Sequence, residues 1–248
     1  MTNQGQAEPQ TGSNRPHAIS ISVFFPCYNE EGNVGPTVTK AREVLDRLGA
    51  DYELIIVDDG SSDDTPRIAD KIAAENPAVK VIHHPTNLGY GAALQSGIRA
   101  AGKNLLFYTD GDGQFDLAEL PPLLPLIGQY DMVIGYRMNR QDNLVRRFNG
   151  WAWTKLVQFA FSLSVRDVDC AFKLYKRAIF DDMRMESTGA LISTEILARA
   201  TRKGYTMTQR GVHHYPRTAG RQTGASPRVI LRAFRELWKL RRRILAEE

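Results

Sequence analysis

Three groups of acidic side chains stand directly after apolar, β-rich stretches of this sequence. They contain Glu30, the pair Asp58 and Asp59, and the pair Asp110 and Asp112. In the third group, glycines separate two carboxylates and the amide of Gln114, so the backbone can bend and bring the three side chains onto one ion. Hard oxygen donors of this kind suit Mg²⁺ or Mn²⁺. We therefore predict a metal site formed by Asp110, Asp112 and Gln114, with a Gly/Asp-rich turn as the alternative.

Basic side chains gather in the other part of the chain. Residues 1–136 hold 9 Lys and Arg against 18 Asp and Glu, whereas residues 137–248 hold 23 against 10. This division suggests a cation site on one side and a phosphate or membrane surface on the other. Arg217 and Arg221 lie in a Gly-rich loop and could grip phosphate oxygens with two hydrogen bonds each. A solvated basic loop is the alternative for this segment.

The elements that must position these side chains alternate along the chain. Apolar β-rich stretches at 19–25, 52–57, 79–83, 104–108 and 131–135 are separated by helix-period segments at 34–48, 65–76 and 90–101 and a short one at 117–127. This order predicts an α/β fold with a mostly parallel central sheet flanked by helices. Ligands of such sheets bind at the carboxyl ends of the strands. The three acidic groups should therefore meet at one edge, where a cation would relieve their repulsion.

The remaining sequence predicts a helix at 151–165, a strand at 172–175, a helix at 194–203, a strand at 205–209 and a final helix. We expect a disordered tail at 1–17, a single domain at 18–226 and a basic amphipathic helix at 227–248. The apolar residues of this last helix recur every three or four positions among arginines. That pattern is typical of a helix on anionic lipid, although packing on the protein's own core is nearly as good an interpretation.

Composition excludes several classes of protein. Of 248 residues, 42% are hydrophobic and 24% are charged, which excludes a disordered or coiled-coil chain. Two cysteines cannot form a disulfide framework, and no apolar stretch is long enough to span a bilayer. We expect a cytoplasmic protein.

The glycines at 87–94 follow the third predicted strand, whereas a dinucleotide-binding fingerprint belongs on the turn after the first strand. No base-reading motif indicates a nucleic-acid partner.

Taken in order, the motifs resemble family-two glycosyltransferases of the GT-A fold, closest to the polyprenyl-phosphate, dolichol-phosphate mannosyltransferase-like branch. The resemblance covers residues 19–224. It is carried by VFFPCYNEEGNV (23–34), IIVDDGSSDDT (55–65), NLGYGAALQSGI (87–98), YTDGDGQFD (108–116), IGYR (134–137) and RDVDCAFKLYKR (166–177).

This resemblance implies an inverting transfer of a hexose, mannose first and glucose second, from a nucleotide-diphosphate sugar to a polyprenyl phosphate at the inner face of a membrane. Mg²⁺ or Mn²⁺ would bridge the diphosphate, with Asp112 as a catalytic group. The implied nucleotide-sugar-binding residues are Pro26, Tyr28, Asn29, Glu30, Asp58, Asp59, Asp110 and Gly111. The implied acceptor-phosphate-binding residues are Arg137, Arg146, Arg147, Lys173, Arg217 and Arg221, with Lys173 standing where relatives commonly have Arg.

The acceptor decides whether a general base is needed. A phosphate monoester has a second pKa of about 6, so its oxygen is largely deprotonated at neutral pH. A saccharide or small-molecule hydroxyl would need a carboxylate base, for which Asp167 and Glu195 are the candidates. A nucleotide-binding or nucleic-acid-binding protein without transferase chemistry is a further alternative, and an NAD-dependent oxidoreductase is a distant one.

Overall fold

The computed structural model describes residues 19–138, 144–217 and 227–247, except for the side chains of 144–147 and 227–234. Seven strands in these residues form one sheet. The strand order is β3-β2-β1-β4-β6-β5-β7, and only β6 runs antiparallel to its neighbours. The mostly parallel sheet expected from the sequence is confirmed. The strands are β1 (Ser20–Cys27), β2 (Asp51–Asp58), β3 (Val79–His83), β4 (Leu105–Thr109), β5 (Met132–Met138), β6 (Phe172–Lys176) and β7 (Met207–His213).

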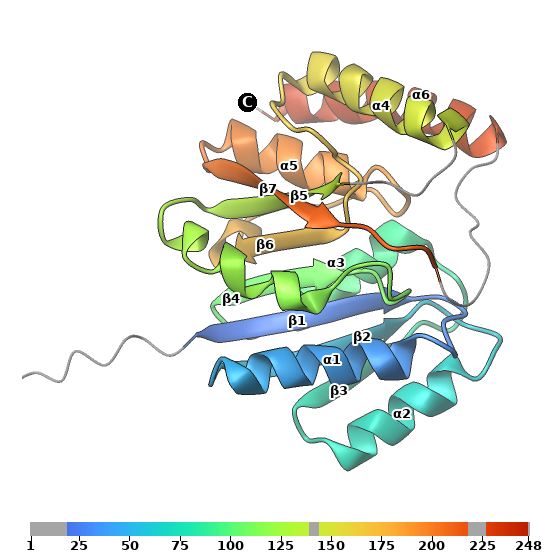
Figure 1. Ribbon diagram of the computed structural model, residues 1–248. Coiled ribbons are helices and arrows are strands. Elements are labelled where there is room, and N and C mark those ends of the chain that lie inside the picture. The colour runs from blue at the N-terminus through green and yellow to red at the C-terminus, as the bar shows by residue number, and fades with distance from the viewer. Residues whose placement is uncertain (1–18, 139–143, 218–226, 248) are drawn as a thin grey trace, which may run out of the picture.

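Helices connect these strands and cover both faces of the sheet (Figure 1). The α-helices are α1 (Val34–Arg47), α2 (Thr65–Glu75), α3 (Tyr90–Ala100), α4 (Leu144–Phe161), α5 (Ile192–Arg202) and α6 (Pro227–Ala246). The helix expected at 117–127 is instead three single 3₁₀ turns, Leu117–Glu119, Pro121–Leu123 and Leu126–Gly128. Three prolines in this segment explain the difference, because each lacks the N–H that an α-helix interior needs.

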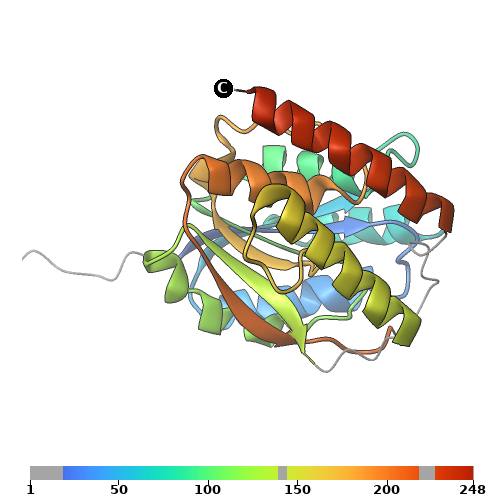
Figure 2. The ribbon, with the colours of Figure 1, turned by 90° about the horizontal axis from the view of Figure 1, so that it is seen from above.

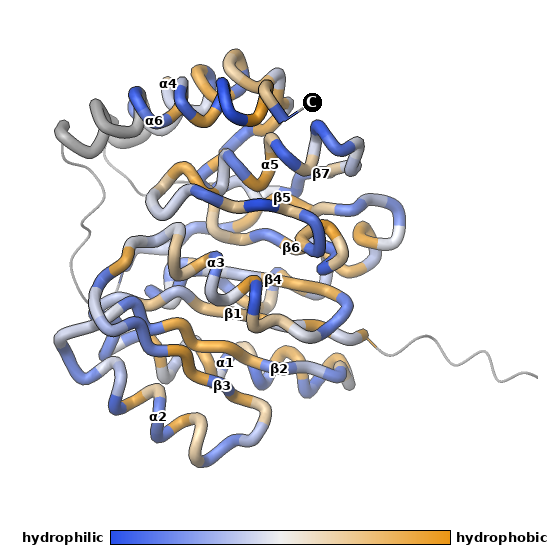
Figure 3. Tube along the Cα trace, turned by 180° about the vertical axis from the view of Figure 1, so that it is seen from behind, coloured by the Kyte–Doolittle hydropathy of each residue, from blue (hydrophilic) through white to orange (hydrophobic). Residues whose placement is uncertain are grey.

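Two hydrophobic cores lie on opposite faces of the sheet. The alternation of strand side chains assigns Phe24 to one core and its neighbours Val23 and Phe25 to the other. Apolar residues of α3, α4, α5 and α6 complete the first core, and those of α1 and α2 complete the second. Figure 3 shows hydrophobic residues concentrated along β1 and β2, whereas hydrophilic and hydrophobic residues alternate along α6.

Helices α4 and α6 lie side by side at one end of the molecule (Figure 2). The inner face of α6 packs on the first core through Leu237, Leu240 and Ile244, each at most 3% exposed. Trp238 and Leu245 on the same helix are each 44% exposed. The final helix therefore packs on its own protein along one face and leaves apolar side chains on the other. Across the described residues, no helix has the length and apolarity needed to cross a membrane.

Candidate active site

A cleft of about 1130 Å³ opens at the carboxyl edge of the sheet, beyond the ends of β1, β2 and β4. Many of the predicted site residues line it, although they come from distant parts of the chain. These are Pro26, Tyr28, Asn29, Glu30, Asp59, Asp110, Gly111, Asp112 and Arg217. The rule that ligands bind at the carboxyl ends of parallel strands therefore located this cleft from sequence.

The loop after β4 carries the two carboxylates that the sequence singled out. Gly111 lies between them and packs on the end of β1, where its N–H donates to the carbonyl oxygen of Pro26 at 3.3 Å. A Cβ at this position would stand 2.4 Å from the Sγ of Cys27, so only glycine fits. The hydroxyl of Tyr90 donates to Asp110 Oδ1 at 3.0 Å, and Asp112 Oδ1 accepts from the backbone N–H of Gln114 at 3.1 Å. Both carboxylates are thus fixed on the cleft wall.

The surroundings of Asp110 and Asp112 disfavour the charged forms of both carboxyl groups. Burial, followed by the neighbouring Asp112 carboxylate, raises the pKa of Asp110 to about 7. Burial also raises the pKa of Asp112. The positive charge of Arg217 lies beside this pair and partly offsets its negative charge. Nη1 of Arg217 is 3.7 Å from Asp112 Oδ2, and its Nη2 forms an ion pair with Glu30.

Two carboxylates that line one cleft, the half-buried Asp110 and the buried Asp112, fit a divalent cation by their chemistry, since hard oxygen ligands suit Mg²⁺ and Mn²⁺. The side-chain amide of Gln114 is engaged elsewhere, although its backbone N–H contacts Asp112. Its side-chain amide donates to the carbonyl oxygen of Tyr215 at 2.9 Å, and the residue does not line the cleft. The structure therefore brings together two of the three predicted metal ligands.

Asp59 is held rigidly at the cleft by groups from the next βα unit. Its Oδ1 lies 2.7 Å from Nδ1 of His84 and accepts from the N–H of Leu88 at 2.9 Å, while its Oδ2 accepts from the N–H of Gly89 at 2.9 Å. Asp58 does not line the cleft, and its Oδ2 lies 2.9 Å from Nδ1 of His83. Of this predicted nucleotide-binding pair, only Asp59 reaches the cleft.

The glycine motif at 87–94 contributes more to the site than its sequence alone indicated. Tyr90 and Asn87 line the cleft, together with Ala190 from a distant segment. The carbonyl oxygen of Thr188 accepts from the N–H groups of Gly91 and Ala92 at 2.9 and 3.2 Å, so it caps the start of α3. The position of the motif between β3 and α3 was the available signal for Tyr90 and Asn87. Nothing local in the sequence identifies Ala190.

Arg137 and Asp167 are bound to each other. The guanidinium donates through Nε and Nη2 to the two carboxylate oxygens at 2.7 and 2.8 Å, and both side chains are largely buried. Neither residue lines the cleft. A predicted phosphate ligand and a predicted general base are therefore paired in this structure. The side chains of Arg146 and Arg147 and the whole of Arg221 lie outside the described residues.

Lys173 lies in the core and does not reach the surface. Its side chain is fully buried, and its ammonium group donates to the carbonyl oxygens of Val168 and Cys170 at 3.1 and 2.6 Å and to the hydroxyl of Tyr108 at 3.1 Å. An ammonium group has three N–H donors, and these contacts use all three. This placement disagrees with the predicted acceptor-phosphate role, because no donor is left for a ligand.

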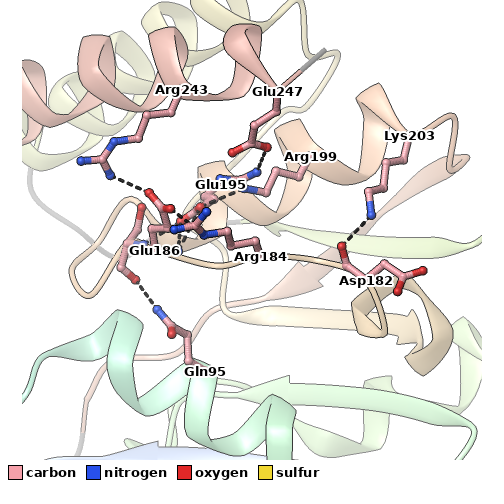
Figure 4. A network of polar contacts seen from close by, with 10 residues as sticks. Gln95, Asp182, Arg184, Glu186, Glu195, Arg199, Lys203, Arg243 and Glu247 are labelled. Atoms are coloured by element: carbon pink, nitrogen blue, oxygen red, sulfur yellow. Dashed lines mark hydrogen bonds and ion pairs between the residues drawn. The ribbon is translucent and has the colours of Figure 1, made fainter.

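Glu195 is also fully buried. Its carboxylate accepts from the N–H groups of Glu186 and Ser187 at 3.1 and 2.7 Å and from Arg199 Nε at 2.9 Å. Figure 4 shows it within a polar network beneath α6, and it is not among the residues that line the cleft. The predicted catalytic role of Glu195 does not fit this position. The residue instead fixes the segment whose Thr188 carbonyl caps α3.

Comparisons with known proteins agree with this architecture. The family model described as Glycosyl transferase family 2 matches residues 22–184. Dodecaprenyl-phosphate galacturonate synthase of Rhizobium johnstonii is 32% identical over 187 residues, covering 73% of this chain and 55% of that protein. Undecaprenyl-phosphate 4-deoxy-4-formamido-L-arabinose transferase of Pseudomonas fluorescens is 30% identical over 226 residues, covering 89% and 64%. The chain thus spans about half to two thirds of the length of these curated relatives.

Solved structures extend the likeness to the fold. Glucosyl-3-phosphoglycerate synthase from Mycobacterium tuberculosis, in complex with Mn²⁺, uridine diphosphate and glucosyl-3-phosphoglycerate, aligns with a TM-score of 0.62 and 19% identity, covering 92% of this chain and 78% of that one. The family model spans well over half of the sequence, and the fold is shared with this solved structure. The chain therefore belongs to glycosyl transferase family 2 and has the GT-A fold.

Proposed function

We propose that this chain transfers a sugar from a nucleotide-diphosphate sugar to a polyprenyl phosphate, with inversion at the anomeric carbon. The observation that carries the proposal is the cleft in which Asp110 and Asp112 face Arg217 beside the residues after β1. The names of both curated relatives, which contain a polyprenyl phosphate and a sugar, support this acceptor.

Asp110 and Asp112 would hold Mg²⁺ or Mn²⁺. Among the residues that the structure describes, no cluster of three or more His, Cys, Asp and Glu could hold a metal ion. Mg²⁺ sites of one or two carboxylates completed by substrate phosphates and water are common, so two ligands suffice. When bound, the cation neutralises charge on the leaving nucleotide diphosphate. Tyr90 orients Asp110, and Arg217 stands where the diphosphate oxygens would approach Asp112.

A phosphate acceptor fits the positions of the remaining carboxylates better than a hydroxyl acceptor does. A largely deprotonated phosphate oxygen needs little help from a general base, so catalysis depends on orientation and leaving-group stabilisation. Glu195 is buried, and both oxygens of Asp167 are engaged by Arg137. In this proposal, Asp167 orients Arg137, and Arg137, Arg146, Arg147, Arg217 and Arg221 are the candidates for holding the acceptor phosphate.

The exposed face of the α4–α6 pair supports peripheral binding to the inner, anionic face of a membrane. Phe148, Trp151 and Phe159 are 63%, 57% and 79% exposed and recur along one face of α4. On α6, Trp238 is exposed beside Arg235, Lys239 and Arg242. Exposed aromatic rings next to cationic side chains match the interfacial region of an anionic bilayer. We propose that this face brings the cleft to its lipid acceptor.

The identity of the transferred sugar is the most specific part of the proposal. Mannose, implied by the resemblance, remains the first candidate and glucose the second. The two curated relatives carry galacturonate and 4-deoxy-4-formamido-L-arabinose in their names, so both sugars belong among the donors to be tested.

An assay of sugar transfer to polyprenyl phosphate tests the function. The donors are nucleotide sugars carrying mannose, glucose, galacturonate and 4-deoxy-4-formamido-L-arabinose, with Mn²⁺ present or chelated, and the control acceptor is the matching polyprenyl alcohol. We expect transfer to the phosphate alone and a loss of about 10²-fold or more in the Asp112→Ala variant. Full turnover of Asp112→Ala with metal present would refute the metal assignment. Efficient transfer to the alcohol, lost in Asp167→Asn, would favour a hydroxyl acceptor and a base role for Asp167.

Sedimentation with anionic vesicles tests the membrane surface separately. Deleting α6 is unsuitable because Leu237, Leu240 and Ile244 belong to the core. The Trp151→Ser and Phe159→Ser double variant removes only exposed rings, so folding should be unchanged and vesicle binding weaker. The control is Leu88→Ser, which removes a 49% exposed side chain near the cleft and should leave vesicle binding as in wild type. Phe180→Ser would be unsuitable as a control because that ring is buried. Equal sedimentation of the α4 variant and wild type would refute the proposed surface.

A further inference from the structure

A second cavity, of about 250 Å³, lies between the ends of α5 and α6. The end of α5 precedes β7, which runs parallel to β5, so the cavity lies at the amino edge of the sheet and the catalytic cleft lies at the opposite edge. The charged residues that line it are Asp182, Arg184, Arg199, Arg202, Lys203 and Glu247. Four cations and two carboxylates thus line this small cavity, and two of the cations, Arg184 and Arg199, are also paired with Glu186 and Glu195.

Arg199 is the most buried of these cations, with only 6% of its side chain exposed. Its Nε donates to Glu195 at 2.9 Å, and its Nη1 forms an ion pair with Glu247 (Figure 4). Its Nη2 is buried and has no hydrogen-bond partner within the described part of the chain. A buried donor without a partner costs free energy, so the guanidinium of this cavity-lining residue retains one unused N–H donor group.

We infer that this cavity binds a phosphate group and that Glu247 occupies the phosphate position when none is bound. A guanidinium presents two parallel N–H groups that match two oxygens of a phosphate. Glu247 engages Nη1 and leaves Nη2 without a partner, whereas a tetrahedral phosphate can engage both. The Glu247 side chain is 44% exposed, so it can swing into solvent when a phosphate displaces it.

The other groups around Arg199 favour an anion of this size. Lys203 lines the cavity and donates to the carbonyl oxygen of Asp182 at 2.8 Å, a neutral partner that does not cancel the ammonium charge. Arg184 pairs with Glu186 at 2.9 Å but is 80% exposed and can reorient. The volume is below that of pockets for drug-sized ligands and suits one phosphate monoester. Free phosphate and a phospholipid headgroup share this chemistry, and α6 places the cavity next to the proposed membrane surface.

Calorimetric titration with inorganic phosphate at constant ionic strength tests the inference. In Glu247→Gln, which removes the competing carboxylate, we expect phosphate to bind about tenfold more tightly than in wild type. In Arg199→Lys, which keeps the charge and loses the paired donors, and in Lys203→Met, we expect binding about tenfold weaker. Glu75→Gln, which removes one exposed carboxylate on the distant helix α2, is the matched control and should bind as wild type does. None of these residues lines the catalytic cleft, so phosphate bound there contributes equally to every titration.

Phosphate affinities of Glu247→Gln and Lys203→Met equal to that of wild type would overturn the inference, even if Arg199→Lys fails to fold. Sedimentation with phosphatidylcholine vesicles, with and without phosphatidic acid, then distinguishes the source of the phosphate. A gain in binding to phosphatidic acid in Glu247→Gln supports a headgroup, and a response to inorganic phosphate alone supports a soluble ligand.

Discussion

The buried ammonium group of Lys173 provides the sharpest test of how this fold is held together. Replacing Lys173 with Met keeps most of the side-chain volume and removes the donor for the carbonyl oxygens of Val168 and Cys170 and for the Tyr108 hydroxyl. A buried acceptor left without a partner costs about 1–3 kcal/mol. For three acceptors this cost is several-fold larger, but the variant no longer has to bury a charged group, which offsets part of it. We therefore expect the free energy of unfolding to fall by about 3 kcal/mol.

Thermal and urea unfolding, followed by circular dichroism, measure this loss. For a chain of this length, about 3 kcal/mol corresponds to a fall of about 6–12 °C in Tm. The matched control is Lys176→Met on the same strand. Lys176 is 42% exposed and pairs with Asp131 at 2.9 Å, so its removal should cost no more than about 1 kcal/mol.

Two results would refute this account of Lys173. The first is a Lys173→Met variant as stable as Lys176→Met, since the three hydrogen bonds would then contribute little. The second is a stable Lys173→Met enzyme whose KM for polyprenyl phosphate alone rises, since the ammonium would then bind the acceptor. We expect instead that stability falls and that any loss of activity lies mainly in kcat, through displacement of the loop between α4 and β6.

Three further predictions concern the site and its supports. Gly91→Ala should destabilise the fold by about 1–3 kcal/mol in urea unfolding, because the new Cβ would stand 2.4 Å from the Ser187 carbonyl oxygen; Gly35→Ala in α1, with open space around it, should be neutral or slightly stabilising. Tyr90→Phe should weaken Mn²⁺ binding about tenfold in a metal-dependent thermal shift, and an unchanged metal midpoint would contradict the orienting role of the hydroxyl. Hydrogen bonds to Asp58 and then Asp70 raise the pKa of His83, so protonation stabilises the folded state below about pH 6.5 and this contribution is lost as pH rises through the raised pKa. The Tm difference between wild type and His83→Gln should therefore shrink from pH 6 to pH 9, and a constant difference would argue against linkage at this residue.

Local patterns were enough to predict most of the fold. Strand β3 and the helices α1, α2 and α3 begin at the predicted residues, because apolar periodicity and flanking turn residues act within a few positions of the chain. The short helix at 117–127 was mispredicted where prolines interrupt it. The strand at 172–175 was predicted, but its antiparallel direction was not, since direction depends on how the α4 connection crosses the sheet.

The candidate site divides in the same way. Asp59, Asp110 and Asp112 were predicted to meet because each follows a parallel strand, and one rule of sheet architecture brings such residues to a common edge. The fates of Lys173, Glu195 and the Arg137–Asp167 pair were decided only by tertiary structure. Residue type states that a side chain is charged and can bind phosphate or act as a base. Packing decides whether that side chain faces a cleft or forms its hydrogen bonds and ion pairs with residues distant in the sequence, and no local pattern records packing.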